Sequence, residues 1–241
     1  MRTRPLTVAV LALATLTGCG FPALPGPAVT NFIPSAAPAG QPVGSGQLSA
    51  DGFDAAQRMA VRIRNVGCGS LSTGSGFAID ANTLITNRHV VADSAELQVS
   101  TYDGRDVAVT AASTASIADL AVVRTSEDLP YYPELADADP IPGDAVTVVG
   151  YPQGGQLTVT DGRVIGATTD PLNENLGQVL VTDAEVEPGS SGSAVLDIDG
   201  RVVGVVYAKS TTGQSFIVPV STLRTLLEDS SAFTRTTRCL P

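Results

Sequence analysis

Apolar and polar residues alternate along the first half of the chain in short runs, the pattern of β-strands with one buried face. Met59–Val66 is the clearest of these runs. Others lie at Phe77–Ile79, Thr83–Thr86, Glu96–Ser100, Val107–Ala111 and Leu120–Arg124. About six short strands joined by turn residues are enough to form one small β-barrel.

A second series of strand-like runs follows a proline-rich stretch, Tyr131–Pro142, that has no strand pattern and is predicted to be a linker. The members of the series are Val146–Val149, Gln156–Thr160 with Arg163–Ala167, Val179–Thr182, Ala194–Ile198, Val202–Tyr207 and Ser215–Val220. Ser221 then precedes an amphipathic stretch, which predicts an N-capped helix over residues 221–229. The pattern predicts an all-β protein with a short C-terminal helix, although strand count alone does not separate two barrels from a sandwich.

Composition excludes some classes of partner. The chain has 241 residues with a net charge of −10, and Lys209 is its only lysine. No nucleic-acid partner is expected, because nucleic-acid phosphates require a basic face. His89 is the only histidine and the cysteines lack the spacing of metal ligands, so neither a metal site nor a cofactor is predicted.

The N-terminus has the features of an export signal. Arg2 and Arg4 precede an apolar stretch, Leu6–Leu16, that is short for a transmembrane helix. The four residues ending at Cys19 resemble a bacterial lipobox, in which the signal peptidase cuts before the cysteine. This resemblance implies a signal peptide over residues 1–18 and a lipid anchor to the membrane through acylated Cys19. The alternative is an ordinary secretory signal with an incidental cysteine.

Residues 19–55 are rich in Pro, Gly, Ala and Ser and show no periodicity, so they are predicted to tether the protein to the membrane. Export also places the chain in an oxidising compartment, where Cys68 and Cys239 remain as an even pair. A disulfide between them is predicted, and two free thiols are the alternative.

The candidate chemistry centres on a loop of small residues in the second half of the chain. Gly189 and Gly192 permit the backbone angles of a sharp turn that presents Ser191. A serine becomes a nucleophile only when a base accepts its proton and donors hold an oxyanion. His89 supplies the only imidazole, and Asp119 lies between the two in the sequence, at the start of another apolar run.

Taken singly, each feature has an ordinary structural explanation, since Gly/Ser runs usually form turns and a lone His or Asp beside a strand is usually structural. Together they stand in four motifs, Gly74–Phe77, Thr86–Val91, Asp119–Val122 and Gly189–Ser193. In this order the motifs resemble those of the trypsin-like (chymotrypsin-fold) serine proteases. Bacterial HtrA-type catalytic domains and actinobacterial acid-resistance envelope proteases are the most similar members.

The resemblance extends over roughly residues 58–229 and implies two six-stranded antiparallel β-barrels packed across a cleft. Barrel one is expected at about 58–128 and barrel two at about 143–220, within a protease domain over residues 56–241. The active site would then lie between the barrels, with the His and Asp on the first and the Ser on the second.

The resemblance also implies a role for each candidate residue. Ser191 would be the nucleophile, His89 the general base and Asp119 the group that orients the imidazole. The backbone N–H groups of Gly189 and Ser191 would form the oxyanion hole.

The primary substrate pocket is implied to be lined by Glu185, Val186, Val205 and Tyr207. Glu185 stands where trypsin-like enzymes carry the acid that selects basic side chains. Val186 and the HtrA-type context favour a small or apolar side chain instead. Both preferences remain open at this point.

These inferences predict a lipid-anchored serine endopeptidase on the extracytoplasmic face of the cell membrane, acting on protein or peptide substrates through an acyl-enzyme. The main alternative is a catalytically silent binding or scaffold protein of the cell envelope. A third interpretation is an esterase that uses the same triad.

Overall fold

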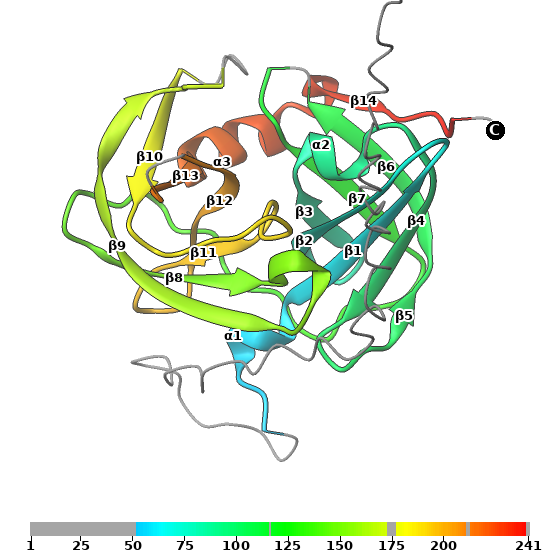
Figure 1. The fold of residues 1–241 in the computed structure, drawn as a ribbon, viewed down its shortest axis with the longest axis horizontal. Coiled ribbons are helices and arrows are strands. Elements are labelled where there is room, and N and C mark those ends of the chain that lie inside the picture. Colours follow the sequence, from blue (N-terminus) through cyan, green and yellow to red (C-terminus); the bar gives the residue numbers. More distant parts are fainter. Residues whose placement is uncertain (1–51, 116, 173–176, 211–212, 240–241) are drawn as a thin grey trace, which may run out of the picture. The chain divides into compact units, whose positions relative to one another are not determined.

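A computed structural model of the chain describes residues 52–115, 117–172, 177–210 and 213–239. These residues form two antiparallel β-structures and a C-terminal helix (Figure 1), as the apolar pattern predicts. The predicted signal peptide, Cys19 and most of the predicted tether lie outside the described residues. Within the described ranges, no helix is long and apolar enough to span a membrane.

Residues Ala60–Thr125 and the C-terminal strand Phe233–Arg235 form an eight-stranded sheet, which is called the first half of the molecule. In spatial order, its strands are β14 (Phe233–Arg235), β6 (Val109–Ala115), β7 (Ala121–Thr125), β3 (Thr83–Thr86), β2 (Leu71–Asp80), β1 (Ala60–Gly67), β4 (Ser94–Thr101) and β5 (Asp106–Val107). Among the described residues, the end strands β14 and β5 do not pair with each other. The closed six-stranded barrel predicted at about 58–128 is therefore not confirmed.

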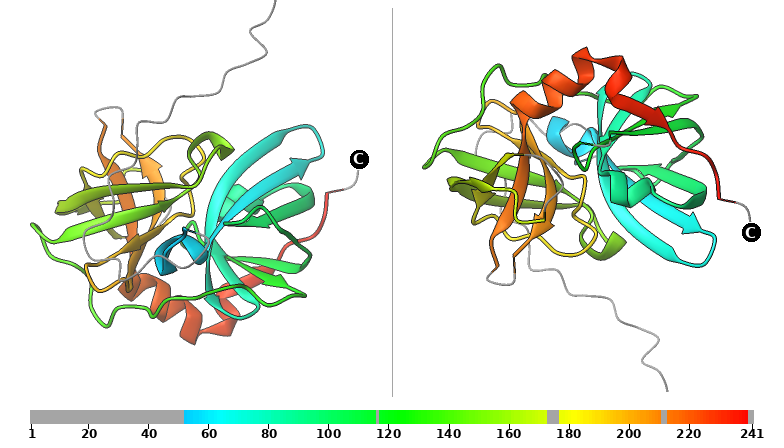
Figure 2. Two further views of the ribbon diagram at one scale, coloured as in Figure 1. Left: turned by 90° about the horizontal axis from the view of Figure 1, so that it is seen from below. Right: turned by 90° about the horizontal axis from the view of Figure 1, so that it is seen from above.

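The C-terminal segment adds a strand to this sheet. β14 pairs along the end of β6, with Phe233 opposite Ala115. Beyond β14, the N–H of Thr236 donates to Ala112 O on β6, and the N–H of Cys239 donates to Ser94 O on β4, both at 2.9 Å. The segment thus bridges the two sides of the opening, and Figure 2 shows it in red along the curved first sheet.

The second half forms the closed six-stranded barrel that was predicted there. Its strands follow in spatial order as β10 (Gln178–Thr182), β13 (Ser215–Pro219), β12 (Val202–Lys209), β11 (Ala194–Leu196), β8 (Ala145–Gly150) and β9 (Thr158–Thr169). β9 merges two predicted runs into one strand, because polar Asp161 and Gly162 continue the pairing opposite β8. A 3₁₀ turn, η1 (Pro152–Gly154), follows β8.

Apolar side chains collect in three buried clusters. One fills the first sheet around Ile63, Leu84 and Val123, and another fills the closed barrel around Val195 and Ile217. The third contains residues of both halves, including Phe77 and Ile85 from the first and Val149 and Leu223 from the second. The two halves are therefore packed together by a shared apolar core, which holds their facing edges in a fixed relation.

The C-terminal helix α3 (Val220–Glu228) lies where it was expected, but its cap differs from the prediction. Pro219 occupies the N-cap position and makes no side-chain hydrogen bond. Ser221 instead lies inside the first turn, and its N–H and Oγ both donate to the carboxylate of Asp139, at 2.9 and 2.6 Å. The acceptor for the helix N-terminus comes from a distant part of the chain, which a local sequence pattern does not show.

The predicted linker Tyr131–Pro142 has no regular strand of its own and runs beside β12. The N–H of Val202 donates to Glu134 O at 2.9 Å, and the N–H of Ala136 donates to Val202 O at 2.8 Å. The short helix α1 (Ala55–Arg58) precedes β1, and a second short helix, α2 (Arg88–Val91), lies between β3 and β4. A 3₁₀ turn, η2 (Ser230–Ala232), joins α3 to β14.

Cys68 and Cys239 form a disulfide, with their Cα atoms 6.0 Å apart and a sequence separation of 171. The bond fastens the C-terminal segment to the turn between β1 and β2. Because closing so long a loop removes entropy from the unfolded chain, the disulfide should stabilise the fold by roughly 5 kcal/mol in the chain-entropy model.

We therefore predict that reduction lowers the melting temperature by about 10 °C or more, at the usual 2–4 °C per kcal/mol for a domain of this size. Calorimetry with and without reductant measures the shift. The Cys68→Ser/Cys239→Ser double variant is the control, and its melting temperature should not respond to reductant. An oxidised wild type that melts like this variant would contradict the stabilising role.

Candidate active site

His89 and Asp119 form a close pair on the first sheet. His89 lies in α2, which directly follows β3, and Asp119 lies just before β7, the neighbour of β3. The Asp119 carboxylate accepts from the backbone N–H of His89 at 3.0 Å through Oδ1, and its Oδ2 lies 2.5 Å from Nδ1 of the ring. An ionised carboxylate only accepts hydrogen bonds, so Nδ1 carries the proton and Nε2 of the neutral ring is the acceptor.

Backbone contacts hold this pair in place. Asp119 is 3% exposed, and its backbone carbonyl accepts from Asn87 Nδ2 at 2.7 Å and from the N–H of Arg88 at 3.2 Å. Asn65 Nδ2 on β1 donates to the carbonyls of Val90 and Ala92, at 3.0 and 2.8 Å, which fixes the end of α2. The imidazole itself remains about half exposed, with 49% of the side chain accessible.

The predicted serine loop precedes β11 in the second half, as Figure 1 shows. Gly189 and Gly192 have φ angles of +94° and +87°, in the left-handed region that glycine tolerates best. The N–H of Gly192 donates to Val206 O on β12 at 2.8 Å, so the loop is tied to the barrel wall. Of the three serines, Ser190 and Ser193 are buried and Ser191 is partly exposed.

Two backbone donors in this loop are left open. Among the described residues, the N–H groups of Gly189 and Ser191 donate no hydrogen bond. The carbonyl of Pro188 accepts from the N–H of Gln153 at 2.5 Å, so it is turned toward η1. In a trans peptide the C=O and the following N–H point in opposite directions, so the N–H of Gly189 is directed away from η1.

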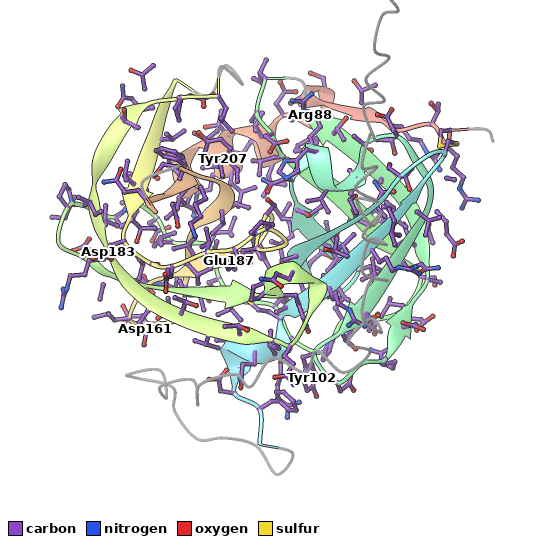
Figure 3. The ribbon with its side chains drawn as sticks, viewed as in Figure 1. Arg88, Tyr102, Asp161, Asp183, Glu187 and Tyr207 are labelled. Atoms are coloured by element: carbon purple, nitrogen blue, oxygen red, sulfur yellow. A yellow bond between two sulfur atoms is a disulfide. The ribbon has the colours of Figure 1, made fainter. Side chains whose placement is uncertain are left out.

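The His–Asp pair and the serine loop are connected through β2. The N–H of Ser75 donates to Ser191 O at 2.8 Å, and Thr86 Oγ1, at the end of β3, donates to Ser75 O at 2.6 Å. Between Ser191 Oγ and His89 Nε2, the structure contains no hydrogen bond. Figure 3 marks Arg88 on α2 and Glu187 on the serine loop.

The four predicted pocket residues have different surroundings. Val186 and Val205 are buried in the apolar clusters of the barrel. Tyr207 is also buried, and its hydroxyl donates to Asp170 Oδ1 at 2.8 Å. Glu185 is exposed and borders a pocket of about 180 Å³ beside the serine loop. The assignment of these four side chains as pocket walls therefore stays a prediction.

A second charged contact borders the same loop. Lys209, at the end of β12, lies 3.5 Å from Glu187 through Nζ and Oε1. Tyr151, directly after β8, is buried beside the loop, and burial raises the pKa of its phenol to about 12. Like an unperturbed phenol, it is neutral at physiological pH and adds no charge to the site.

Sequence reasoning missed several residues that position the site. Asn65 and Asn87 were parts of strand and motif patterns without an assigned role, and Gln153 was not considered. Asn65 had a detectable signal, since it occupies the inward-facing parity of Val61 and Ile63 on β1. A polar residue at a core position usually has a specific hydrogen-bond partner. Gln153 has a positive φ of 56°, which its sequence neighbours did not indicate.

The fold and this site together define the chymotrypsin-like class of β-proteins, in which a His–Asp pair on one β-domain faces a glycine-bounded serine loop on the other. The family model of the trypsin-like peptidase domain matches residues 74–205. The chain therefore belongs to the trypsin-like peptidase family, as the four sequence motifs predicted.

Individual relatives place the chain near the HtrA-type members. Mitochondrial serine protease HTRA2 of Bos taurus is 37% identical over 164 residues, which are 65% of this chain and 36% of the relative. A probable periplasmic DegP-like serine endoprotease of Hahella chejuensis is 33% identical over 62% of this chain and 33% of its own. The chain thus spans about a third of the length of these curated relatives.

A solved structure gives a similar result. The active form of the Rv3671c protease from M. tuberculosis matches with a TM-score of 0.65 and 26% identity, over 77% of this chain and 85% of that one.

The close approach at Gly192 generates a prediction about stability. A Cβ atom at this position would lie 2.1 Å from Ser75 O and 2.5 Å from Thr86 Oγ1, whereas one at Gly200 would meet nothing within 4 Å. Both glycines have positive φ angles. Gly200→Ala should therefore cost about 1 kcal/mol of unfolding free energy from the backbone alone, and Gly192→Ala about 3 kcal/mol because steric overlap is added.

Urea unfolding of both variants measures these costs, and Gly200→Ala is the matched control for the backbone term. Equal destabilisation would show that β2 moves away from the loop easily.

Proposed function

We propose that this protein is a serine endopeptidase that hydrolyses peptide bonds through an acyl-enzyme. The observation that carries the proposal is the pair of hydrogen bonds that the Asp119 carboxylate accepts from the ring and the backbone N–H of His89, on the sheet that contacts the loop of Ser191. The relatives are named as serine proteases and endoproteases, which supports the same reaction class.

In the proposed mechanism, Ser191 Oγ attacks the carbonyl carbon of the scissile bond while His89 Nε2 accepts its proton. Asp119 keeps the second ring proton on Nδ1 and stabilises the imidazolium that forms. The oxyanion accepts hydrogen bonds from the N–H groups of Gly189 and Ser191, which donate to no other group in the described residues. His89 then gives the proton to the leaving amine as the peptide C–N bond breaks, which leaves the acyl-enzyme. Water next attacks the acyl carbon while His89 accepts its proton, and Ser191 is released with that proton.

Substrate is proposed to bind between the two halves, since the His–Asp pair and the serine loop come from opposite sides. In the same proposal, the loop beside Glu185 and the end of β12 form the primary pocket. Glu185 makes no hydrogen bond or ion pair with any described residue, so its carboxylate is available to a basic substrate side chain.

Replacement of the triad residues tests this proposal. Ser191→Ala and His89→Ala should each lower kcat for peptide cleavage by about 10⁴-fold or more, and Asp119→Asn by about 10⁴-fold. Labelling of the full chain by a fluorophosphonate should disappear in the first two variants.

Ser193→Ala is the matched control, because Ser193 is a fully buried serine in the same loop and should keep both activities. A wild type that is folded but unlabelled would contradict the proposal and favour a binding or scaffold role. Turnover of esters without peptide cleavage would indicate an esterase.

We also propose that acylated Cys19 anchors the protein on the extracytoplasmic face of the membrane. The basic residues, short apolar stretch and small residues before Cys19 support this assignment. A relative named as periplasmic is consistent with activity outside the cytoplasm.

In a bacterial host supplied with labelled palmitate, the wild type should incorporate label and partition into a detergent phase. Cys19→Ser should lose both properties, while Cys68→Ser, the matched control, should retain them. An unlabelled wild type in the aqueous phase would contradict the anchor.

A further inference from the structure

Ser75 has no role in the mechanism above, although it lies in the Gly74–Phe77 motif. It is on β2 of the first sheet and is fully buried. Its hydroxyl donates to Gly189 O at 2.8 Å and accepts from the N–H of Tyr151 at 2.8 Å. Both partners belong to the second half of the molecule. One hydroxyl from the first half therefore links two backbone groups of the second half.

Gly189 lies between two peptide units that are each held by a hydrogen bond. The carbonyl of Pro188 accepts from Gln153, and the carbonyl of Gly189 accepts from Ser75 Oγ. With φ at +94°, Gly189 has no side chain to resist rotation of these units. The direction of its N–H therefore depends on the two hydrogen bonds.

We propose that the Ser75 hydroxyl is a positioning group for the oxyanion hole, acting by holding the Gly189 carbonyl. The inference rests on the proposed function of the site and adds a residue to it. Ser75 does not touch the substrate and is not a catalytic residue. It keeps the Gly189 N–H aimed at the place where the oxyanion forms.

The rest of Ser75 reinforces this role. Its N–H donates to Ser191 O, and its carbonyl accepts from Thr86 Oγ1 at 2.6 Å. The residue thus contacts both proposed oxyanion donors through their carbonyls and also the end of the strand that leads to His89. Loss of the hydroxyl removes the hydrogen bonds to Gly189 O and from the N–H of Tyr151, and leaves the hydrogen bonds of the Ser75 backbone in place.

Ser75→Ala tests the inference in the full chain. Its kcat for a peptide substrate should fall about 10- to 100-fold, because a misplaced donor costs much of what a missing donor costs. KM should change less than about twofold, since the ground-state carbonyl uses these donors weakly. Affinity for a peptidyl boronic acid, which forms a tetrahedral adduct with the serine, should fall in parallel with kcat.

Thr182→Val is the matched control. Thr182 is also fully buried, and its hydroxyl donates to Arg163 O at 2.7 Å and accepts from the N–H of Ala184 at 3.1 Å. It thus has the same two kinds of backbone partner as Ser75, but neither partner of its hydroxyl lies in the Gly189–Ser193 loop. Thr182→Val should lose stability to a similar extent and keep kcat within about twofold.

A kcat of Ser75→Ala equal to the wild type, or an equal fall in Thr182→Val, would overturn the inference. Ser75→Cys provides a second variant of similar volume in which the thiol is a weak donor, and it should reproduce the fall in kcat.

Hydrogen exchange separates this inference from the proposed function. The segment of residues 185–193 should exchange faster in Ser75→Ala than in Thr182→Val, whether or not the protein turns over substrate. If the wild type is inactive, the proposed function fails, and exchange alone decides whether Ser75 holds Gly189. Equal exchange rates of this segment in the two variants would show that the Ser75 hydroxyl does not hold Gly189.

Discussion

The close backbone contact between β2 and the serine loop is the constraint on which the site depends. Ser75 donates its N–H to Ser191 O at 2.8 Å, and a Cβ atom on Gly192 would lie 2.1 Å from Ser75 O. Such an approach leaves no room for a side chain at residue 192, so glycine is what allows the loop to lie this close to β2. Thr86 Oγ1 donates to the carbonyl of Ser75, so the end of β3 and the helix that carries His89 are also linked to Ser75.

The two halves contribute different kinds of polar group to the proposed site. The first half buries a carboxylate, and burial of a charge is costly unless hydrogen bonds and opposite charge compensate it. Asp119 has the N–H and ring of His89 as donors, and Arg88 Nε lies 3.9 Å from Oδ1. The second half presents backbone N–H groups, which need no buried charge and depend only on the path of the loop. A site divided in this way responds to any change in the separation of its halves.

Strand positions were predictable because the alternation of apolar and polar residues follows directly from burial of one sheet face. The pairing of His89 with Asp119, across a gap of 30 residues, followed from motif order and resemblance rather than from physics alone. The start of β2 at Leu71 was missed because Gly74, Ser75 and Gly76 give no apolar signal. The cap of α3 by Asp139 and the bridging C-terminal segment were missed because both join residues far apart in sequence.

The open sheet and the closed barrel need different fastening. A closed barrel has no free edges, so the second half requires no further link to keep its shape. The first sheet does not close on itself among the described residues, and it carries the disulfide, the pairing of β14 with β6 and the hydrogen bond from Cys239 to Ser94. β6 leads directly to the loop of Asp119, and the N–H of Ala115 donates to Leu120 O at 2.9 Å. Fastening the C-terminal segment to β6 therefore also steadies the strand that positions the carboxylate of the proposed triad.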